Sequence, residues 1–162
     1  MEKIKWIEDY LKEASRLLAE EGHEAALRLL DKLLYEEPGY GRLHNLLGVI
    51  YFYCADEIAK AEIHFRAAIL LDPRLAEPYE HYAKLLHHEE RLNDAIGISK
   101  KGLRAKQANK QLLLENVGQA YELKKEFRKA IKHYRKALTY TADLWNGRIL
   151  DESIKRCKRK QK

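Results

Sequence analysis

A repeat of about 34 residues constrains this chain more than any other feature of its sequence. Alanine recurs at Ala26, Ala61, Ala95 and Ala130, at spacings of 35, 34 and 35 residues. Three further columns keep the same step: Ala14, Gly48, Ala83 and Gly118; Leu17, Tyr51, Leu86 and Tyr121; and Leu33, Ala68, Gly102 and Ala137. A period of this length is typical of solenoids, in which each unit buries its apolar face by stacking on its neighbours.

Inside each unit the apolar residues recur every three or four positions, which is the period of an α-helix. Leu47 and Tyr51 share one helical face, and Phe65 lies on the next helix. Pro38 and Pro73 end the first two units, because proline cannot continue a helix. The sequence therefore predicts four helical hairpins, over residues of about 7–40, 41–75, 76–109 and 110–142.

Helical spacing continues beyond the fourth hairpin, at Trp145, Ile149, Ile154 and Cys157. This pattern predicts a ninth helix from Asp143 to about Lys160, within a capping helix and basic tail over 143–162. A terminal helix covers the apolar face that the last repeat would otherwise leave bare. We therefore expect this helix to bury Trp145, and we expect Cys54 to pack inside the second hairpin.

These columns resemble the tetratricopeptide repeat (TPR) family, and the second unit matches best, through Leu47-Gly48, Tyr51, Ala61, Phe65, Ala68 and Pro73. The fourth unit also matches well, whereas the third has Ser99 at the usual aromatic position and the first is degenerate. The resemblance implies an all-α fold: an α-solenoid of four TPR hairpins that form a right-handed superhelix. It also implies a non-catalytic interaction module or scaffold, whose first helices line a concave groove that binds a peptide segment of a partner protein.

The family's groove columns, transferred to this sequence, give a partner-binding lining. Its first unit contributes Glu8, Leu11, Ser15 and Leu18, and the later units contribute Arg42, Asn45, Val49, Phe52, Glu77, Glu80, Lys84, His87, Leu112, Glu115, Gln119 and Glu122. Five Glu face only Arg42 and Lys84, so a ligand with basic residues is favoured. We expect Leu18, Val49 and Phe52 to form the apolar anchor. The Glu pair at 77 and 80 disfavours the family's carboxylate clamp for chaperone tails.

The charge distribution leaves a second interpretation open. Residues 1–123 hold 17 Lys and Arg against 21 Asp and Glu, whereas residues 124–162 hold 14 against 4. Such a basic end can attract nucleic acid, an anionic membrane surface or an acidic partner. The residues concerned are Lys124, Lys125, Arg128, Lys129, Lys132, Arg135 and Lys136. A role like that of the type III secretion chaperones, some of which are small TPR proteins, is a further alternative, and the oligomeric state stays open.

Signals for catalysis, cofactors and export are missing from the sequence. There is no phosphate loop or dinucleotide glycine pattern, and Leu92 stands where a metalloprotease helix would need a second His after His88. We therefore predict no enzyme, no cofactor and no metal site. The two cysteines do not form a disulfide framework, and residues 1–20 lack the apolar core of a signal peptide. The longest apolar run is too short for a membrane span, so we expect a cytoplasmic protein.

Overall fold

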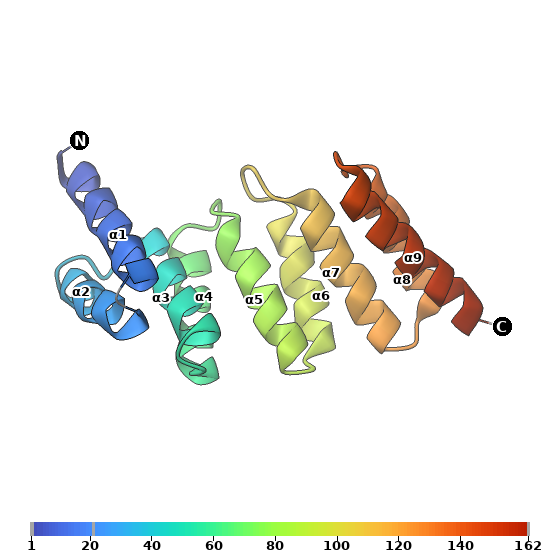
Figure 1. Ribbon diagram of the computed structural model, residues 1–162, viewed down its shortest axis with the longest axis horizontal. Helices are drawn as coiled ribbons and strands as arrows, with labels where there is room; N and C mark the ends of the chain where they lie inside the picture. Colours follow the sequence, from blue (N-terminus) through green and yellow to red (C-terminus); the bar gives the residue numbers. More distant parts are fainter. Residues whose placement is uncertain (1, 21, 162) are drawn as a thin grey trace. The chain divides into compact units, whose positions relative to one another are not determined.

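The computed structural model describes residues 2–20 and 22–161, and within them it contains nine α-helices and no strand (Figure 1). The helices are α1 (Glu2–Glu20), α2 (His23–Glu36), α3 (Gly41–Tyr53), α4 (Ile58–Leu71), α5 (Glu77–His88), α6 (Leu92–Gly102), α7 (Lys110–Leu123), α8 (Phe127–Leu138) and α9 (Leu144–Lys160). The prediction of an all-α fold with eight repeat helices and a ninth terminal helix is confirmed.

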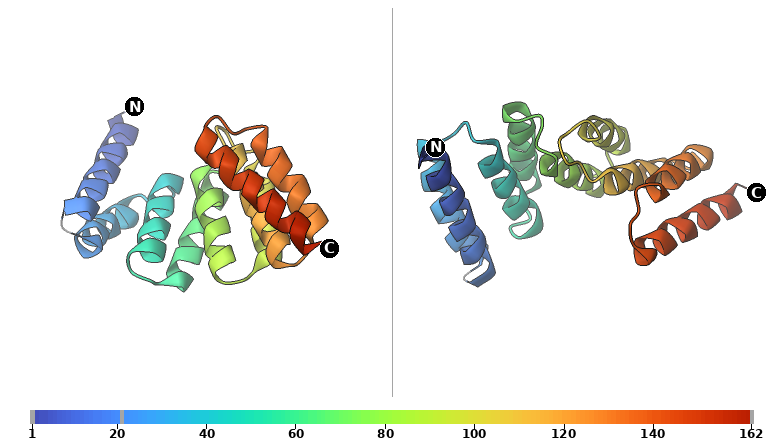
Figure 2. Two further views of the ribbon diagram at one scale, coloured as in Figure 1. Left: turned by 45° about the vertical axis from the view of Figure 1, so that its right-hand side comes forward. Right: turned by 90° about the horizontal axis from the view of Figure 1, so that it is seen from above.

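The chain divides into two compact units, of which the first ends at Pro78 and the second begins at Tyr79. In the first unit α1 packs on α2 and α3 packs on α4. In the second unit α7 packs on both α6 and α8, and α9 lies along α8 (Figure 2). Successive helices within each unit run antiparallel, so each pair is a helical hairpin.

Small residues lie where two helices cross most closely. A Cβ atom added at Gly48 would lie 2.6 Å from the ring of Phe65, and one at Gly118 would lie 2.6 Å from the ring of Tyr134. The alanines of the repeat columns are fully buried, as Ala61 illustrates. Glycine and alanine recur in register because larger side chains would keep the two helices of a hairpin apart.

Each unit has its own apolar core. In the first unit the fully buried residues Leu30, Leu33, Leu43, Leu47 and Ile50 form its centre. In the second unit a cluster of α7, α8 and α9 includes Leu114, Tyr134, Leu150 and Cys157. The last helix is therefore part of the second core, which agrees with its predicted capping role.

The hairpin turns contain a repeated feature that the sequence does not reveal. Gly22, Asp56, Glu90 and Lys125 all have positive φ angles, of 90°, 54°, 55° and 60°. These four positions follow one another at the same step as the alanine columns, between the two helices of each hairpin. A left-handed residue reverses the chain here, although only the first unit uses the glycine that suits this conformation.

Two packing predictions are wrong. Trp145 is 71% exposed, because α9 turns Leu150, Ile154 and Cys157 toward the core instead. Cys54 is exposed because α3 ends at Tyr53, which leaves the cysteine at the helix C-cap. Within the described residues, no helix combines the length and the apolar character that a membrane crossing requires.

Candidate functional site

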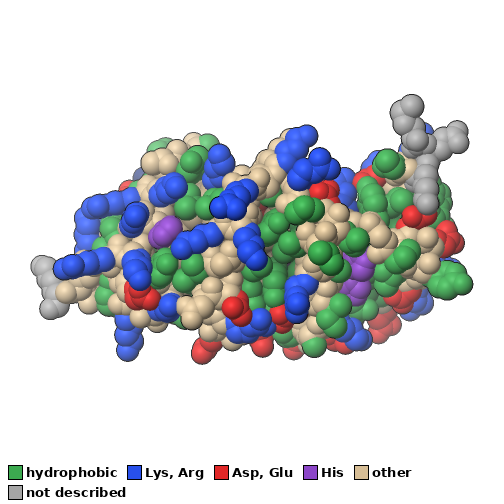
Figure 3. All heavy atoms as spheres, turned by 180° about the vertical axis from the view of Figure 1, so that it is seen from behind, with side chains coloured by type: hydrophobic (Ala, Val, Ile, Leu, Met, Phe, Trp, Pro, Cys, Tyr) green, Lys and Arg blue, Asp and Glu red, His purple; other side chains and the backbone are tan. Residues whose placement is uncertain are grey.

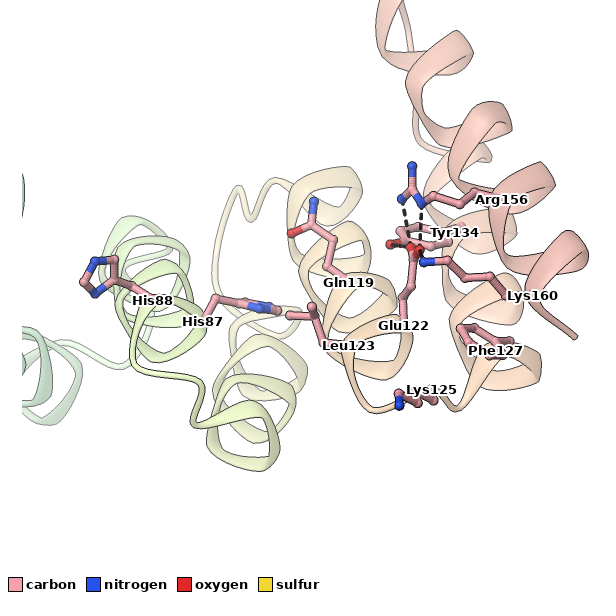
Figure 4. Close-up of a pocket in the computed structure, with 10 residues that line it drawn as sticks. All are labelled: His87, His88, Gln119, Glu122, Leu123, Lys125, Phe127, Tyr134, Arg156 and Lys160. Carbon is pink, nitrogen blue, oxygen red and sulfur yellow. Dashed lines mark hydrogen bonds and ion pairs between the residues drawn. The ribbon is translucent and has the colours of Figure 1, made fainter.

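A pocket of about 730 Å³ lies in the second unit, between α5, α7, the start of α8 and the end of α9 (Figure 4). Its lining combines five basic or His side chains with the apolar side chains of Leu123 and Phe127. The residues are His87, His88, Gln119, Glu122, Leu123, Lys125, Phe127, Tyr134, Arg156 and Lys160. Three of the predicted groove residues, His87, Gln119 and Glu122, are among them.

Glu122 is the centre of a charged network on the wall of this pocket. Its carboxylate accepts hydrogen bonds from Arg156 Nε at 2.6 Å and from Arg156 Nη2 at 2.8 Å. It also accepts one from the Tyr134 hydroxyl at 3.0 Å and one from Lys160 Nζ at 3.2 Å. The network therefore joins α7, α8 and α9 around a carboxylate that is only 9% exposed.

These contacts change the acidity of the groups involved. The Arg156 hydrogen bonds lower the pKa of Glu122 to about 2, against the opposing effect of burial, and Tyr134 and Lys160 lower it further. Burial, with the neighbouring carboxylate of Glu122, raises the pKa of Tyr134 well above its ordinary value. Glu122 is consequently ionised and Tyr134 remains a hydrogen-bond donor at neutral pH.

His87 fixes the opposite wall of the pocket. Its Nε2 donates a hydrogen bond to the backbone oxygen of Asn116 at 2.8 Å, which joins α5 to α7. Burial lowers the pKa of His87, although the bond to Asn116 opposes this shift. The imidazole is therefore neutral at pH 7, and its hydrogen bond holds α5 and α7 together.

The lining of this pocket is not acidic, unlike the groove lining that the sequence predicts, and the preference of the groove for a basic ligand stays a prediction. Lys125, Arg156 and Lys160 face a single carboxylate, Glu122, which already accepts bonds from two of them. The prediction counted only residues of the first helices, so it omitted the two cations of α9. An unmatched positive charge at this pocket favours an acidic group in a ligand.

Apolar side chains complete the pocket. Leu123 is 60% exposed at the end of α7. Phe127 is half-buried at the start of α8, with Lys160 Nζ lying 6.0 Å from its ring centroid. Such exposed apolar surface beside a polar rim is typical of sites that bind a partner.

The other predicted groove residues of this unit lie on α5 and α7. Glu80 accepts a hydrogen bond from the backbone N–H of Asn109 at 3.1 Å. Glu115 accepts one from Gln119 Nε2 at 3.2 Å, and burial raises the pKa of this carboxyl. Leu112 is half-buried, and Lys84 is exposed. None of these four lines the pocket, and Glu77 is the exposed first residue of α5.

In the first unit, the predicted acidic lining is also partly neutralised. Arg42 Nη1 lies 3.0 Å from Glu8 Oε1, and the Tyr40 hydroxyl donates a hydrogen bond to the same carboxylate. The hydrogen bond from Tyr40, followed by the bond from Arg42, lowers the pKa of Glu8. Glu8 therefore serves as an internal partner for α3, which limits its availability to a ligand.

The apolar groove residues of this unit differ in exposure. Val49 and Phe52 are half-buried on α3, and the ring centroid of Phe52 lies 4.6 Å from that of Tyr53. Leu18 packs against the core of the first unit. Leu11, which was predicted to line the groove, is instead a core residue at 8% exposure.

Two uncharged polar groove residues lie in the first unit, Ser15 on α1 and Asn45 on α3. The Ser15 hydroxyl donates a hydrogen bond to the backbone oxygen of Leu11 at 2.9 Å. Asn45 is half-buried, and its side-chain oxygen is buried with no hydrogen-bond partner in the described part of the chain.

The basic end predicted from the sequence forms a surface on α8, and Figure 3 shows Lys and Arg side chains gathered over the second unit. Lys124 and Lys129 both pair with Glu126, which accounts for part of this charge. Lys129 also lies 5.3 Å from the ring centroid of Tyr121, which stacks on His133 with 5.5 Å between ring centroids. The excess of positive charge on α8 stays available for an anionic surface.

Among residues 2–20 and 22–161, no three His, Cys, Asp or Glu side chains gather closely enough to hold a metal ion. The titratable residues of the Glu122 network bond one another. These bonds hold the charged side chains in fixed positions on the wall of the pocket.

Comparison with solved structures shows what this chain is similar to. No protein-family model matches the chain, and no curated protein matches it by sequence. It is similar to PilF of Pseudomonas aeruginosa, with a TM-score of 0.86 and 18% identity over 99% of this chain and 71% of that chain. It is also similar to the MamA protein, with a TM-score of 0.82 and 18% identity over 99% of this chain and 84% of that chain.

A third similar structure is the TPR2B domain of yeast Sti1 in its complex with pHsp70. Its TM-score is 0.66 and its identity 22%, over 75% of this chain and 98% of that chain. At these identities the likeness establishes the fold of the chain, which is the helical-hairpin repeat that the sequence predicted.

Proposed function

We propose that this chain, whose fold is that of the tetratricopeptide repeat, is a non-catalytic module that binds a peptide segment of a partner protein. The observation that supports this proposal best is the pocket of the second unit, in which exposed Leu123 lies beside cations that exceed the local carboxylates. A pocket that offers an apolar contact and a charge of one sign can select a short segment by two features at once.

The proposed ligand at this pocket is a segment with an acidic group next to an apolar side chain. The acidic group would contact Lys125 and Lys160, which line the pocket with Arg156. The apolar side chain would pack on Leu123 and Phe127. Since the Glu122 network holds Arg156 and Lys160 in place, binding needs little further ordering of these long side chains.

In the first unit we propose that the same kind of segment is anchored on α3. Val49 and Phe52 present partly exposed apolar surface there. Aromatic anchors contribute most of the binding energy in many interfaces. Phe52 is therefore the proposed anchor of the first unit.

Leu123→Asp is expected to weaken partner binding by at least about 1 kcal/mol, because it removes apolar surface and places a carboxylate in the pocket. The partner is first isolated by affinity capture from the native host and then purified. Calorimetric titration of the purified partner gives Kd for each variant. Ile63→Asp is the matched control, because Ile63 is similarly exposed on α4 at 65%. Equal loss of binding in both variants would contradict a role for the pocket.

Phe52→Ala is expected to weaken the same interaction by at least about 1 kcal/mol, since truncation removes the aromatic anchor of α3. The same titration measures it, with circular dichroism as a check that the helices remain. The competing hypothesis places docking on the basic face of α8. It predicts that Lys129→Glu with Lys132→Glu abolishes binding while Phe52→Ala and Leu123→Asp leave it intact.

The cytoplasm remains the proposed compartment. Cys54 is an exposed free thiol and Cys157 a buried one. Free thiols are typical of reducing compartments.

A further inference from the structure

Exposed apolar side chains gather where α8 ends and α9 begins. Leu144 is 86% exposed and Trp145 71% exposed, and Tyr140 and Ile149 are also exposed. No residue of the second core covers them, because α9 turns a different face toward α8. The capping role of α9 therefore does not account for these four side chains.

An ordered backbone holds these side chains in place. The Asp143 side chain caps α9 by accepting hydrogen bonds from the backbone N–H of Asn146 at 2.8 Å and from its side-chain amide at 2.7 Å. Trp145 and Ile149 are then one helical turn apart, so they share a face. Lys110 of α7 lies 5.3 Å from the ring centroid of Tyr140. The patch is thus a built surface of the second unit.

Positive charge surrounds the patch. The α6–α7 and α8–α9 loops lie at the same end of the antiparallel helices (Figures 1 and 2). The last turn of α8, the two loops and the adjoining helix starts contain six cations: Arg104, Lys106, Lys110, Arg135, Lys136 and Arg148. Three carboxylates lie near this end. Backbone N–H groups engage Asp143 at Asn146 and Glu80 at Asn109, and Glu77 is the exposed first residue of α5, so the cations exceed the carboxylates.

We infer that this end of the second unit is a contact site for a membrane surface that contains anionic lipids. Leu144 and Trp145 enter the boundary between headgroups and acyl chains, where Trp and Tyr side chains are stable. The Lys and Arg side chains at this end contact lipid phosphates, because an anionic leaflet attracts basic residues to its surface. The chain would lie on the bilayer without crossing it.

The chemistry of the patch favours a bilayer over nucleic acid. Leu144, its most exposed member at 86%, and Ile149 are aliphatic, so they add apolar surface that suits acyl chains and gives a base nothing to stack on. The pocket of this unit lies at the other end of the helices, around the α7–α8 turn and the end of α9. Exposed apolar side chains with basic residues nearby therefore suit the surface of an anionic bilayer. This inference is independent of the proposed peptide binding.

The test uses Trp145 as its own probe. The chain has two tryptophans, and Trp6→Phe leaves Trp145 as the remaining one. The protein is titrated with phosphatidylcholine vesicles that contain or lack phosphatidylserine. We expect co-sedimentation and a blue shift of the emission with phosphatidylserine present, and at least about tenfold weaker binding without it, because several basic contacts are lost. Raised salt should weaken binding further.

Two variants decide whether the patch inserts. Leu144→Asp is expected to reduce vesicle affinity at least about tenfold and to reverse the blue shift, because a carboxylate opposes both insertion and anionic lipid. Leu70→Asp is the matched control, since Leu70 is 82% exposed on α4. Vesicle binding without a blue shift, or equal effects of both variants, would overturn the inference. Preferential binding to an RNA or DNA duplex over these vesicles would overturn it as well.

Discussion

Gly118→Leu is expected to lower the free energy of unfolding by about 3 kcal/mol, at the upper end of the cost of overpacking a core. The reason is steric. A Cβ atom alone would lie 2.6 Å from two ring carbons of Tyr134. That ring is 1% exposed and its hydroxyl is bound by Glu122, so it cannot move aside without breaking a buried hydrogen bond. Chemical denaturation followed by circular dichroism measures the loss.

A second glycine gives a control of opposite sign. Gly97 is exposed on α6, and a Cβ atom added there would meet nothing within 4 Å. Gly97→Ala should therefore raise the free energy of unfolding by up to about 1 kcal/mol, because alanine favours the helix. Gly118→Ala gains the same helical preference and is nevertheless expected to destabilise the protein. If the two alanine variants changed stability in the same direction, the close crossing at Gly118 would be refuted.

Glu122→Gln is expected to cost about 2 kcal/mol at neutral pH. A carboxyl with a pKa of about 2 in the folded protein and an ordinary value of 4.5 when unfolded contributes up to about 3 kcal/mol. The expected loss is smaller, because the side chains of Arg156 and Lys160 are about half exposed and solvent screens them. Glutamine can still accept the hydrogen bond of Tyr134, so the change reports the charge.

The same variant predicts the pH dependence. Because the pKa of Glu122 is lowered on folding, its contribution is fully present above about pH 4.5 and is lost as the pH falls toward 2. The wild-type protein should lose more stability than Glu122→Gln over that interval. Denaturant titrations at several pH values compare the two. Glu126→Gln is the control, because Glu126 pairs with Lys124 and Lys129 at the surface and should contribute little.

Much of the fold could be predicted from the sequence because a repeat encodes its own register. The spacing of Gly48 and Gly118 with the alanine columns locates each helix crossing, and the structure places an aromatic ring against both glycines. The left-handed residues of the turns could not be predicted from the sequence, for a physical reason. Gly22, Asp56, Glu90 and Lys125 share a backbone conformation, but glycine, acidic and basic residues all occur among them, so the column has no common residue type in the sequence.

The candidate site could be predicted only in part. His87, Gln119 and Glu122 were found because they fall on the first helices, which the repeat defines. Arg156 and Lys160 could not be predicted in this way, because α9 lies outside the repeat and no repeat column includes its residues. The helical spacing of residues 145–157 predicted which helix would follow, but an apolar pattern does not say that Trp145 faces solvent and Arg156 faces a carboxylate.

Because Arg156 and Lys160 lie on α9, the pocket is formed partly by helices of the repeat and partly by a helix outside it. The walls from α5, α7 and α8 belong to units whose packing forbids most changes, as the crossing at Gly118 shows. The two cations lie on a terminal helix that is outside the repeat and packs mainly on α8. Replacing both cations by neutral residues would leave Glu122 facing only Lys125 and change the electrostatic preference of the pocket. The specificity of this site could therefore diverge between related chains by substitution within one helix, while all four hairpins stay the same.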